Sequence, residues 1–258
     1  MIRGVIFDLG GTLVDKYSLS PLVNLNKAFK HRHITLDNKV ISKDMGLKKY
    51  DHIVAISKES EFKKQFQNIY NRSPVQEDLY DIHNIFNRLQ NKYLQTNLEI
   101  IPEVKSAIDI LKERNIKIGI TTGFNKEQMN YCIKLLNKHN IYPDSAVSST
   151  CKDILSRPTP HMIYENMITM GIENPSEILK VDDTCIGIEE GINAGCLTLG
   201  VARWSINMKV NSFEESLNLE SRNNEFIVKD KLSESRRILH LAKPTYLINT
   251  LEHLHHCL

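Results

Sequence analysis

Short, nearly continuous apolar runs recur at the start of the chain and again throughout its second half. They occupy residues 2–7, 117–123, 177–183 and 196–201; the first is followed directly by Asp8, the second ends in Thr122 and Gly123, and the third ends in two aspartates. A buried parallel strand has this pattern. Helical spacing of apolar residues, as in Val104, Ala107 and Leu111, separates the runs. The alternation predicts an α/β fold, a Rossmann-like doubly wound parallel sheet with helices on both faces.

Residues 19–98 have a different pattern, with few strand candidates. Leu79, Ile82, Phe86 and Tyr93 fall on one face of an amphipathic helix, and residues 71–74 have the composition of a loop between helices. We therefore expect an α-helical cap domain, residues 19–98, inserted into a catalytic core made of residues 1–18 and 99–258.

The C-terminal part of the chain is harder to interpret. Residues 207–235 are polar and are compatible with helices or with a long loop, whereas residues 244–248 predict an edge strand followed by a short final helix. His253, His255 and His256 form a cluster, but no carboxylate or thiol lies at useful ligand spacing. A solvated helix end is the favoured interpretation of that cluster.

Composition narrows the possible partners. A hydrophobic content of 41% in 258 residues is enough for a large core, and 33 basic against 31 acidic residues give no reason to expect nucleic acid or an anionic membrane as a partner. The five cysteines are scattered without a CxxC pair, which favours reduced thiols. No signal-type segment is seen, and no apolar stretch approaches the ~20 residues of a membrane span. We expect a cytoplasmic protein that acts on a small molecule.

Chemically useful side chains lie at the ends of the predicted strands or in adjoining loops. Asp8 and the Asp182–Asp183 pair follow two of these strands, Thr122 ends another, and Arg157 lies in a loop. The carboxyl ends of parallel strands are where ligands bind in open α/β sheets. A single acid at a strand end is equally well explained as a helix cap. Together, however, these groups can provide a carboxylate nucleophile for phosphorus, a second acid for a divalent cation, and a hydroxyl and a cation for phosphoryl oxygens.

Residues 8–15, with the sequence DLGGTLVD, resemble motif one of the haloacid dehalogenase superfamily. The residues that match its motifs two, three and four, in the expected order, are Thr122, Arg157 and Asp183. The resemblance implies that Asp8 is a covalent nucleophile and that Asp8, the Gly10 carbonyl and Asp183 bind Mg²⁺. It also implies catalytic roles for Thr122 and Arg157.

Gly10 departs from the phosphatase pattern of that superfamily. Phosphatases usually carry a second aspartate there, as the general acid for an alkoxide leaving group, and glycine cannot donate a proton. The phosphonatase branch also has a small residue at this position. Its members hydrolyse phosphonoacetaldehyde to acetaldehyde and phosphate, and a lysine Schiff base in the cap draws in the electrons of the breaking C–P bond.

Residues 45–52, with the sequence MGLKKYDH, resemble the cap motif of the phosphonatase branch. The match implies that Lys49 forms the Schiff base and that His52 is the catalytic cap histidine, three residues on and on the same helix face. Lys48, four residues before His52, is the rival. The Schiff-base lysine must be neutral, so its pKa should be lowered. The substrate-binding residues implied by the resemblance are Gly10, Met45, Gly46 and Gly123.

Three further departures keep other functions open. Phe124 replaces the usual tyrosine, Ser18 a usual cysteine, and Gly187 an acid for which Asp182 can partly compensate. The main expectation is a phosphonoacetaldehyde hydrolase-like enzyme. The alternatives are a phosphatase or phosphotransferase that acts on another small organophosphorus substrate, and a non-catalytic relative. The resemblance also implies a homodimer that associates through the cap.

Overall fold

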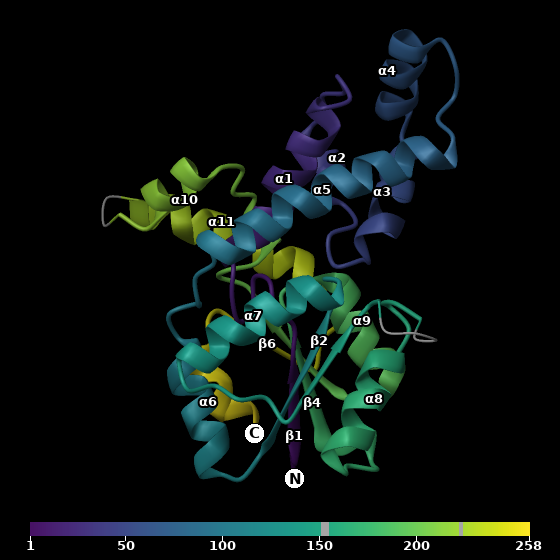
Figure 1. Ribbon diagram of the computed structural model, residues 1–258. Helices are drawn as coiled ribbons and strands as arrows, with labels where there is room; N and C mark the ends of the chain where they lie inside the picture. Colours follow the sequence, from purple (N-terminus) through teal and green to yellow (C-terminus); the bar gives the residue numbers. More distant parts are fainter. Residues whose placement is uncertain (151–154, 222–223) are drawn as a thin grey trace.

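The computed structural model describes residues 1–150, 155–221 and 224–258, and within them six parallel strands form one sheet (Figure 1). The strands are β1 (Gly4–Phe7), β2 (Lys117–Thr122), β3 (Ser145–Ser148), β4 (Ile178–Asp182), β5 (Leu197–Val201) and β6 (Tyr246–Ile248). Their order across the sheet is β3-β2-β1-β4-β5-β6. The predicted α/β, Rossmann-like doubly wound sheet is therefore confirmed. β1 lies in the middle of the sheet, between β2 and β4.

Alternate side chains of β1 enter two different hydrophobic clusters. Val5 and Phe7 join the larger cluster together with residues of the helices that follow the insert, whereas Ile6 packs in a second cluster with Ile163 and Met167. Successive side chains of a strand point to opposite faces of a sheet. The sheet is thus buried on both faces, which explains why its central strands are continuous apolar runs.

Two groups of helices surround the sheet. The helices that follow in the chain after β1 are α1 (Leu19–Lys30), α2 (Asn38–Ser42), α3 (Lys49–Ser57), α4 (Ser60–Tyr70) and α5 (Gln76–Thr96). The helices of the sheet layers and the C-terminal region are α6 (Val104–Glu113), α7 (Lys126–Lys138), α8 (His161–Met170), α9 (Cys185–Ala194), α10 (Phe213–Leu219) and α11 (Glu225–His240). The short 3₁₀ segments are η1 (Lys16–Ser18), η2 (Pro175–Glu177), η3 (Ile206–Met208) and η5 (Leu251–Cys257).

Helices α1–α5 form a group above the carboxyl ends of the strands, at the end of the molecule opposite the N-terminus (Figure 1). The two chain segments that join this helical insert to the sheet lie side by side, because the Asp15 amide donates to the Glu99 carbonyl at 3.1 Å. The Asp15 carboxylate also accepts a hydrogen bond from the Ser20 hydroxyl at 2.7 Å, at the start of α1. The division into a cap of residues 19–98 and a core of residues 1–18 and 99–258 stays a prediction.

Most of the predicted elements are confirmed, including the edge strand β6 and the short helix after it. One strand was missed. β3 has the sequence SAVS, whose small and hydroxyl side chains give no apolar run. The polar region from residue 207 contains α10 and the start of α11. Among the described residues no helix is both long and apolar enough to cross a membrane, and a cytoplasmic location stays a prediction.

Candidate active site

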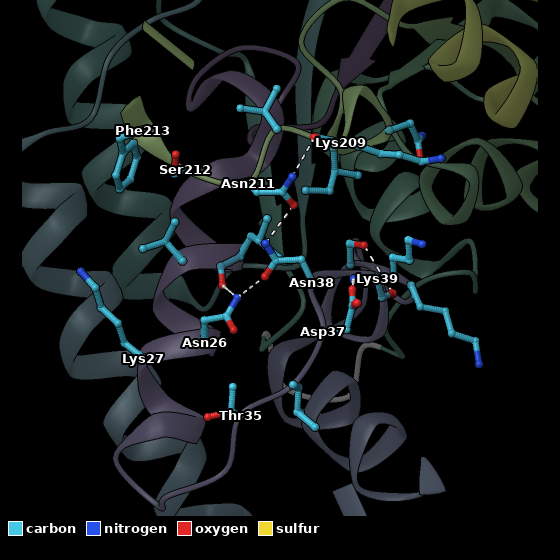
Figure 2. Close-up of a pocket in the computed structure, with 18 of the residues that line it drawn as sticks. Asn26, Lys27, Thr35, Asp37, Asn38, Lys39, Lys209, Asn211, Ser212 and Phe213 are labelled. Atoms are coloured by element: carbon cyan, nitrogen blue, oxygen red, sulfur yellow. Dashed lines mark hydrogen bonds between the residues drawn. The ribbon is translucent and has the colours of Figure 1, made fainter. Parts of the chain in front are cut away.

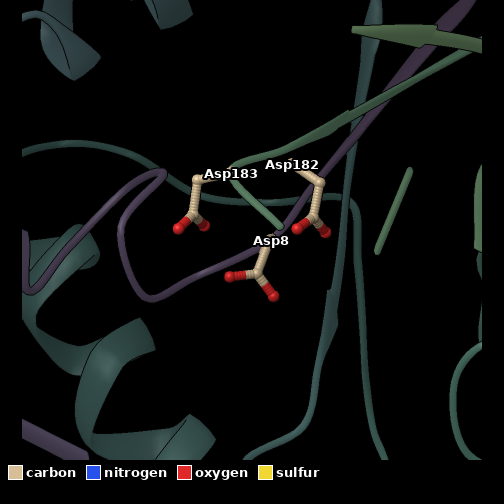
Figure 3. Close-up of side chains that lie close together, drawn as sticks. All are labelled: Asp8, Asp182 and Asp183. Atoms are coloured by element: carbon tan, nitrogen blue, oxygen red, sulfur yellow. The ribbon is translucent and has the colours of Figure 1, made fainter. Parts of the chain in front are cut away.

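Three carboxylates meet at the carboxyl ends of the neighbouring strands β1 and β4 (Figure 3). Asp8 directly follows β1, Asp182 ends β4 and Asp183 follows it. One carboxylate oxygen of each lies within 4.8 Å of those of the other two, and all three side chains are buried. Such a cluster of like charges is unstable unless protons or a cation balance it.

The geometry around Asp183 fits a divalent cation. Its Oδ1 accepts a hydrogen bond from Thr12 Oγ1 at 3.1 Å, but its Oδ2 has no hydrogen-bond partner among the described residues. Burial, followed by the charges of Asp182 and Asp8, raises the pKa of Asp183 well above its usual value. Carboxylate oxygens are the ligands that hard divalent cations prefer. This cluster is therefore suited to hold such an ion; it contains Asp8 and Asp183, and their assignment as metal ligands stays a prediction.

Arg157 is held against Asp8 by hydrogen bonds on three sides. Its Nη1 donates to Asp8 Oδ1 at 2.8 Å, its Nε donates to Glu190 Oε2 at 2.8 Å, and its Nη2 donates to the backbone oxygen and the hydroxyl of Thr121. The side chain is buried. Since Nε and Nη2 are occupied by Glu190 and Thr121, Nη1 is the nitrogen that can donate to a phosphoryl oxygen, and the guanidinium remains charged.

A second buried cation, Lys180, lies in the middle of β4 on the same side of the sheet as Asp182. Its Nζ is 2.9 Å from Asp182 Oδ2 and 3.5 Å from Glu190 Oε2, and it donates to Thr121 Oγ1 at 2.8 Å. The sequence analysis missed Lys180, Glu190 and Thr121. The available signal was a lysine inside the otherwise apolar sequence ILKV, since charged residues are rarely buried unless they are paired.

With every group ionised, the charges of this network do not balance. It contains two cations, Arg157 and Lys180. Against them stand four carboxylates, those of Asp8, Asp182, Asp183 and Glu190. Burial raises the pKa of Asp8 to about 6, although Arg157 opposes the shift. A divalent ion would neutralise the excess of two negative charges and favour the ionised nucleophile.

A small cavity opens directly above Asp8, with a volume of about 30 Å³, close to the volume of one water molecule. The residues that line it are Asp8, Gly10, Ser18, Pro21, Met45, Gly46, Leu47, Lys49, Thr122, Gly123, Phe124, Arg157 and Thr184. The cavity brings together two groups of residues that were singled out from the sequence. Met45, Gly46 and Lys49 come from the insert, and the others come from the rest of the chain: Asp8, Gly10, Thr122, Gly123 and Arg157. Asp183 lies beside Asp8 without lining the cavity.

Lys49 enters this cavity from the first turn of α3 and has few polar neighbours. It is 6% exposed, and its Nζ lies 3.3 Å from the thioether sulfur of Met45. Burial lowers its pKa to about 8, although the charge of Asp8 opposes the shift. Lys48, in contrast, precedes α3 and is half-buried, outside the cavity lining. The surroundings of Lys49 therefore favour a neutral amine.

His52 is fully buried on the same helix but does not line the cavity. Neither of its ring nitrogens has a clear hydrogen-bond partner among the described residues. Burial, followed by the nearby charge of Lys49, lowers its pKa well below the usual value, so the imidazole is neutral. The positive charge of Lys49 thus helps to keep this neighbouring imidazole unprotonated.

Gly187 and Gly10 differ in the space that a side chain would find at each position. A Cβ on Gly187 would lie 1.9 Å from Asp182 Oδ2, so the Asp182 carboxylate fills the space that a side chain at position 187 would need. A Cβ on Gly10 would lie 3.3 Å from Ser18 Oγ and 3.8 Å from the Phe124 ring. Both neighbours line the cavity, so the missing side chain of Gly10 leaves that volume free.

A much larger hollow than this cavity lies elsewhere in the molecule. It is a groove of about 1080 Å³ between α1, the segment that leads into α2, and the segment from η3 to α10 (Figure 2). A chain of hydrogen bonds crosses it, from Asn26 to Asn38 Oδ1 at 2.6 Å and from Asn38 to Asn211 Oδ1 at 2.8 Å. The groove contains none of the catalytic residues inferred from the sequence, so its size does not mark the site of chemistry.

The sequence is similar to that of known hydrolases. Residues 5–201 match the family model described as haloacid dehalogenase-like hydrolase. The chain is 31% identical over 256 residues to a phosphonoacetaldehyde hydrolase of Bacillus cereus, covering 98% of this chain and 96% of that protein. It is 29% identical to one of Bacteroides fragilis, over 98% of this chain and 94% of that protein.

Among solved structures, a phosphonoacetaldehyde hydrolase-like protein of Oleispira antarctica has the same fold, with a TM-score of 0.90. The sequence identity is 24%, and the match covers 99% of this chain and 91% of that one. A β-phosphoglucomutase of Clostridium difficile is a more distant match, with a TM-score of 0.60, 21% identity and coverage of 91% and 98%.

Proposed function

The chain belongs to the haloacid dehalogenase-like hydrolases, and on that basis we propose that it hydrolyses phosphonoacetaldehyde to acetaldehyde and phosphate. One observation carries the proposal. A buried lysine with a lowered pKa shares one small cavity with Asp8, the proposed nucleophile, while Gly10 provides no side-chain acid at its position. The names of the relatives from Bacillus cereus and Bacteroides fragilis support the same substrate.

In the proposed reaction the phosphonate group binds at the carboxyl edge of the sheet. Arg157 Nη1 and the Thr122 hydroxyl provide donors for its oxygens, and Gly123 lies beside them in the cavity lining. Mg²⁺, held by Asp8, the Gly10 carbonyl and Asp183, would screen the negative charges of the nucleophile and the phosphoryl oxygens. The aldehyde end of the substrate then points toward Met45 and Gly46 of the insert.

Lys49 activates the carbon side of the substrate. Its neutral amine attacks the aldehyde carbon, and loss of one water gives a Schiff base, which is protonated at nitrogen. His52, neutral and buried beside Lys49, keeps the surroundings free of a second positive charge. The protonated Schiff base can accept an electron pair, which an unmodified aldehyde does only poorly.

Asp8 then attacks phosphorus. A bond forms between a carboxylate oxygen of Asp8 and phosphorus, the C–P bond breaks, and its electron pair moves into the protonated Schiff base to give an enamine on Lys49. Protonation of the enamine carbon and hydrolysis release acetaldehyde and free the lysine. A second water cleaves the aspartyl-phosphate, which releases phosphate and restores Asp8. No acid at position 10 is required for the bond-breaking step.

Reductive trapping tests the proposal. With phosphonoacetaldehyde present, borohydride should fix the two-carbon unit on Lys49, detected as a mass increase on the peptide that contains this residue. Lys49→Arg should lose turnover by at least about 1000-fold, because arginine stays protonated and forms no Schiff base. Lys48→Arg is the matched control and should keep turnover and labelling. Full turnover by Lys49→Arg would refute the mechanism.

The alternative, a phosphatase or phosphotransferase on another small organophosphorus substrate, makes the opposite prediction. A panel of phosphate esters assayed with Mg²⁺ should give little turnover, because no side chain at position 10 can protonate an alkoxide. Rapid ester hydrolysis without turnover of the aldehyde would favour that alternative. Association of two copies through the insert also stays a prediction, which sedimentation velocity would test.

A further inference from the structure

Glu190 of α9 belongs to the buried charge network, and the reaction above gives it no role. It is fully buried on the helix face that packs against β4. The next residue is Gly191, where a Cβ would lie only 2.8 Å from the Lys180 side chain. A buried carboxylate is costly unless it is paired. Its Oε2 receives hydrogen bonds from Arg157 at 2.8 Å and from Thr121 at 3.1 Å.

These contacts determine which side of the guanidinium faces the nucleophile. Glu190 accepts from Nε, and Thr121 accepts twice from Nη2. The guanidinium is planar, so these two partners fix both its position and its orientation. Nη1 is then directed at Asp8, 2.8 Å away, where a phosphoryl group would bind.

Neutralisation of Lys180 is the competing explanation for Glu190, and the distances do not favour it. Lys180 Nζ lies 2.9 Å from Asp182 but 3.5 Å from Glu190, whereas Arg157 Nε lies 2.8 Å from Glu190. Asp182 is therefore the nearer counter-ion of Lys180. Glu190 is primarily paired with Arg157, through the nitrogen that anchors the guanidinium and not through the one that faces Asp8.

We propose that Glu190 is a positioning residue, which holds Arg157 so that Nη1 is aimed at the phosphoryl group before the substrate arrives. Preorganised donors avoid reorientation during the reaction and therefore bind charge in the transition state more strongly. The inference rests on the proposed function only in that Arg157 binds a tetrahedral oxyanion. It does not depend on the aldehyde or on Lys49.

The test uses the full-length protein with Mg²⁺ and inorganic tungstate, a tetrahedral oxyanion. Glu190→Gln keeps the shape of the side chain but removes its charge, and should weaken tungstate binding in calorimetry by about 10- to 100-fold. Glu190→Asp should recover part of this loss. Glu189→Gln, a substitution of the exposed neighbour on the same helix, should bind tungstate as the unmodified protein does.

An Arg157→Met background separates positioning from a general structural role. There, Glu190→Gln should change tungstate affinity by less than about twofold, because the effect of Glu190 acts through Arg157. Equal losses of affinity in both backgrounds, or unchanged tungstate binding by Glu190→Gln with only a lower melting temperature, would overturn the proposal. If the substrate assignment is wrong, phosphonoacetaldehyde is not turned over by the unmodified protein, yet the tungstate results still decide the role of Glu190.

Discussion

The two walls of the cavity, one from the sheet edge and one from the helical insert, differ in whether their buried cationic groups contact carboxylates. On the sheet side Arg157 and Lys180 each contact two carboxylates or more within 3.5 Å. On the insert side the nearest polar contact of Lys49 is the sulfur of Met45, and His52 has no clear partner among the described residues. The same burial therefore has two different chemical consequences.

On the sheet side, pairing with two cations keeps the Asp182 carboxylate charged. Burial opposes ionisation of Asp182, yet Lys180 and Arg157 hold its pKa below the usual value. On the insert side, burial without pairing removes charge, and the pKa of Lys49 falls to about 8. A phosphoryl group needs fixed charges, and an aldehyde needs a neutral amine. The difference between the two walls matches the two ends of the proposed substrate.

The largest expected effect separates the two walls. Asp8→Asn should lower turnover by about 10⁴-fold or more, because an amide is a very poor nucleophile for phosphorus. Borohydride labelling of Lys49 in the presence of substrate should nevertheless persist, since Schiff base formation uses only the insert side. Turnover assays and peptide mass analysis would measure the two effects. Loss of labelling together with turnover would contradict the division between the walls.

The next effect concerns the space that the Asp182 carboxylate occupies beside Gly187 on the sheet side. Asp182→Gly should lower turnover by about 100-fold, because Lys180 and Arg157 lose a buried counter-ion. Gly187→Asp alone should be at least as harmful, since its Cβ would overlap the Asp182 carboxylate. The double variant, which has room for the new acid, should recover at least about tenfold over either single variant. Additive losses in the double variant would show that the two positions do not share one space.

A smaller effect is the pH dependence on the insert side. The amine of Lys49 is protonated below its pKa, so the initial rate of borohydride labelling should rise about tenfold per pH unit up to about 8 and then level off. Because the charge of Asp8 raises the pKa of Lys49, Asp8→Asn should shift this profile to lower pH. A labelling rate that rises up to pH 10 would mean that the insert side does not lower the pKa of Lys49.

The smallest effect concerns closure of the two walls on one another. Asn38→Ala removes the hydrogen bond between the insert and Asn211 (Figure 2), which we expect to weaken closure by about 1 kcal/mol. Reductive methylation of Lys49 should then be about fivefold faster, because this buried amine reacts only after opening. Asn26→Ala, which removes a bond within the insert, is the control and should leave the rate nearly unchanged. Equal rates for both variants would rule out the Asn38–Asn211 bond as a closure contact.

The sequence predicted those parts of the fold and site that follow from local pattern. Continuous apolar runs identified β1, β2, β4 and β5, because strands buried on both faces admit few polar residues. Acids at the ends of such runs must meet at one sheet edge, and this is enough to predict that Asp8 and Asp183 lie together. β3, with its sequence SAVS, lacked the pattern and was missed.

Tertiary structure alone decided which charges are paired and which are not. Lys180 and Glu190 come from a strand and a helix, and no local pattern indicates that both contact Thr121 and lie beside Arg157. The order of residues also leaves Lys48 and Lys49 nearly equivalent, whereas the fold buries one against Met45 and leaves the other half-buried. Ionisation depends on solvent exposure and on neighbouring charges. Those are properties of the packed chain, so the sequence could name the reactive groups but not their states of charge.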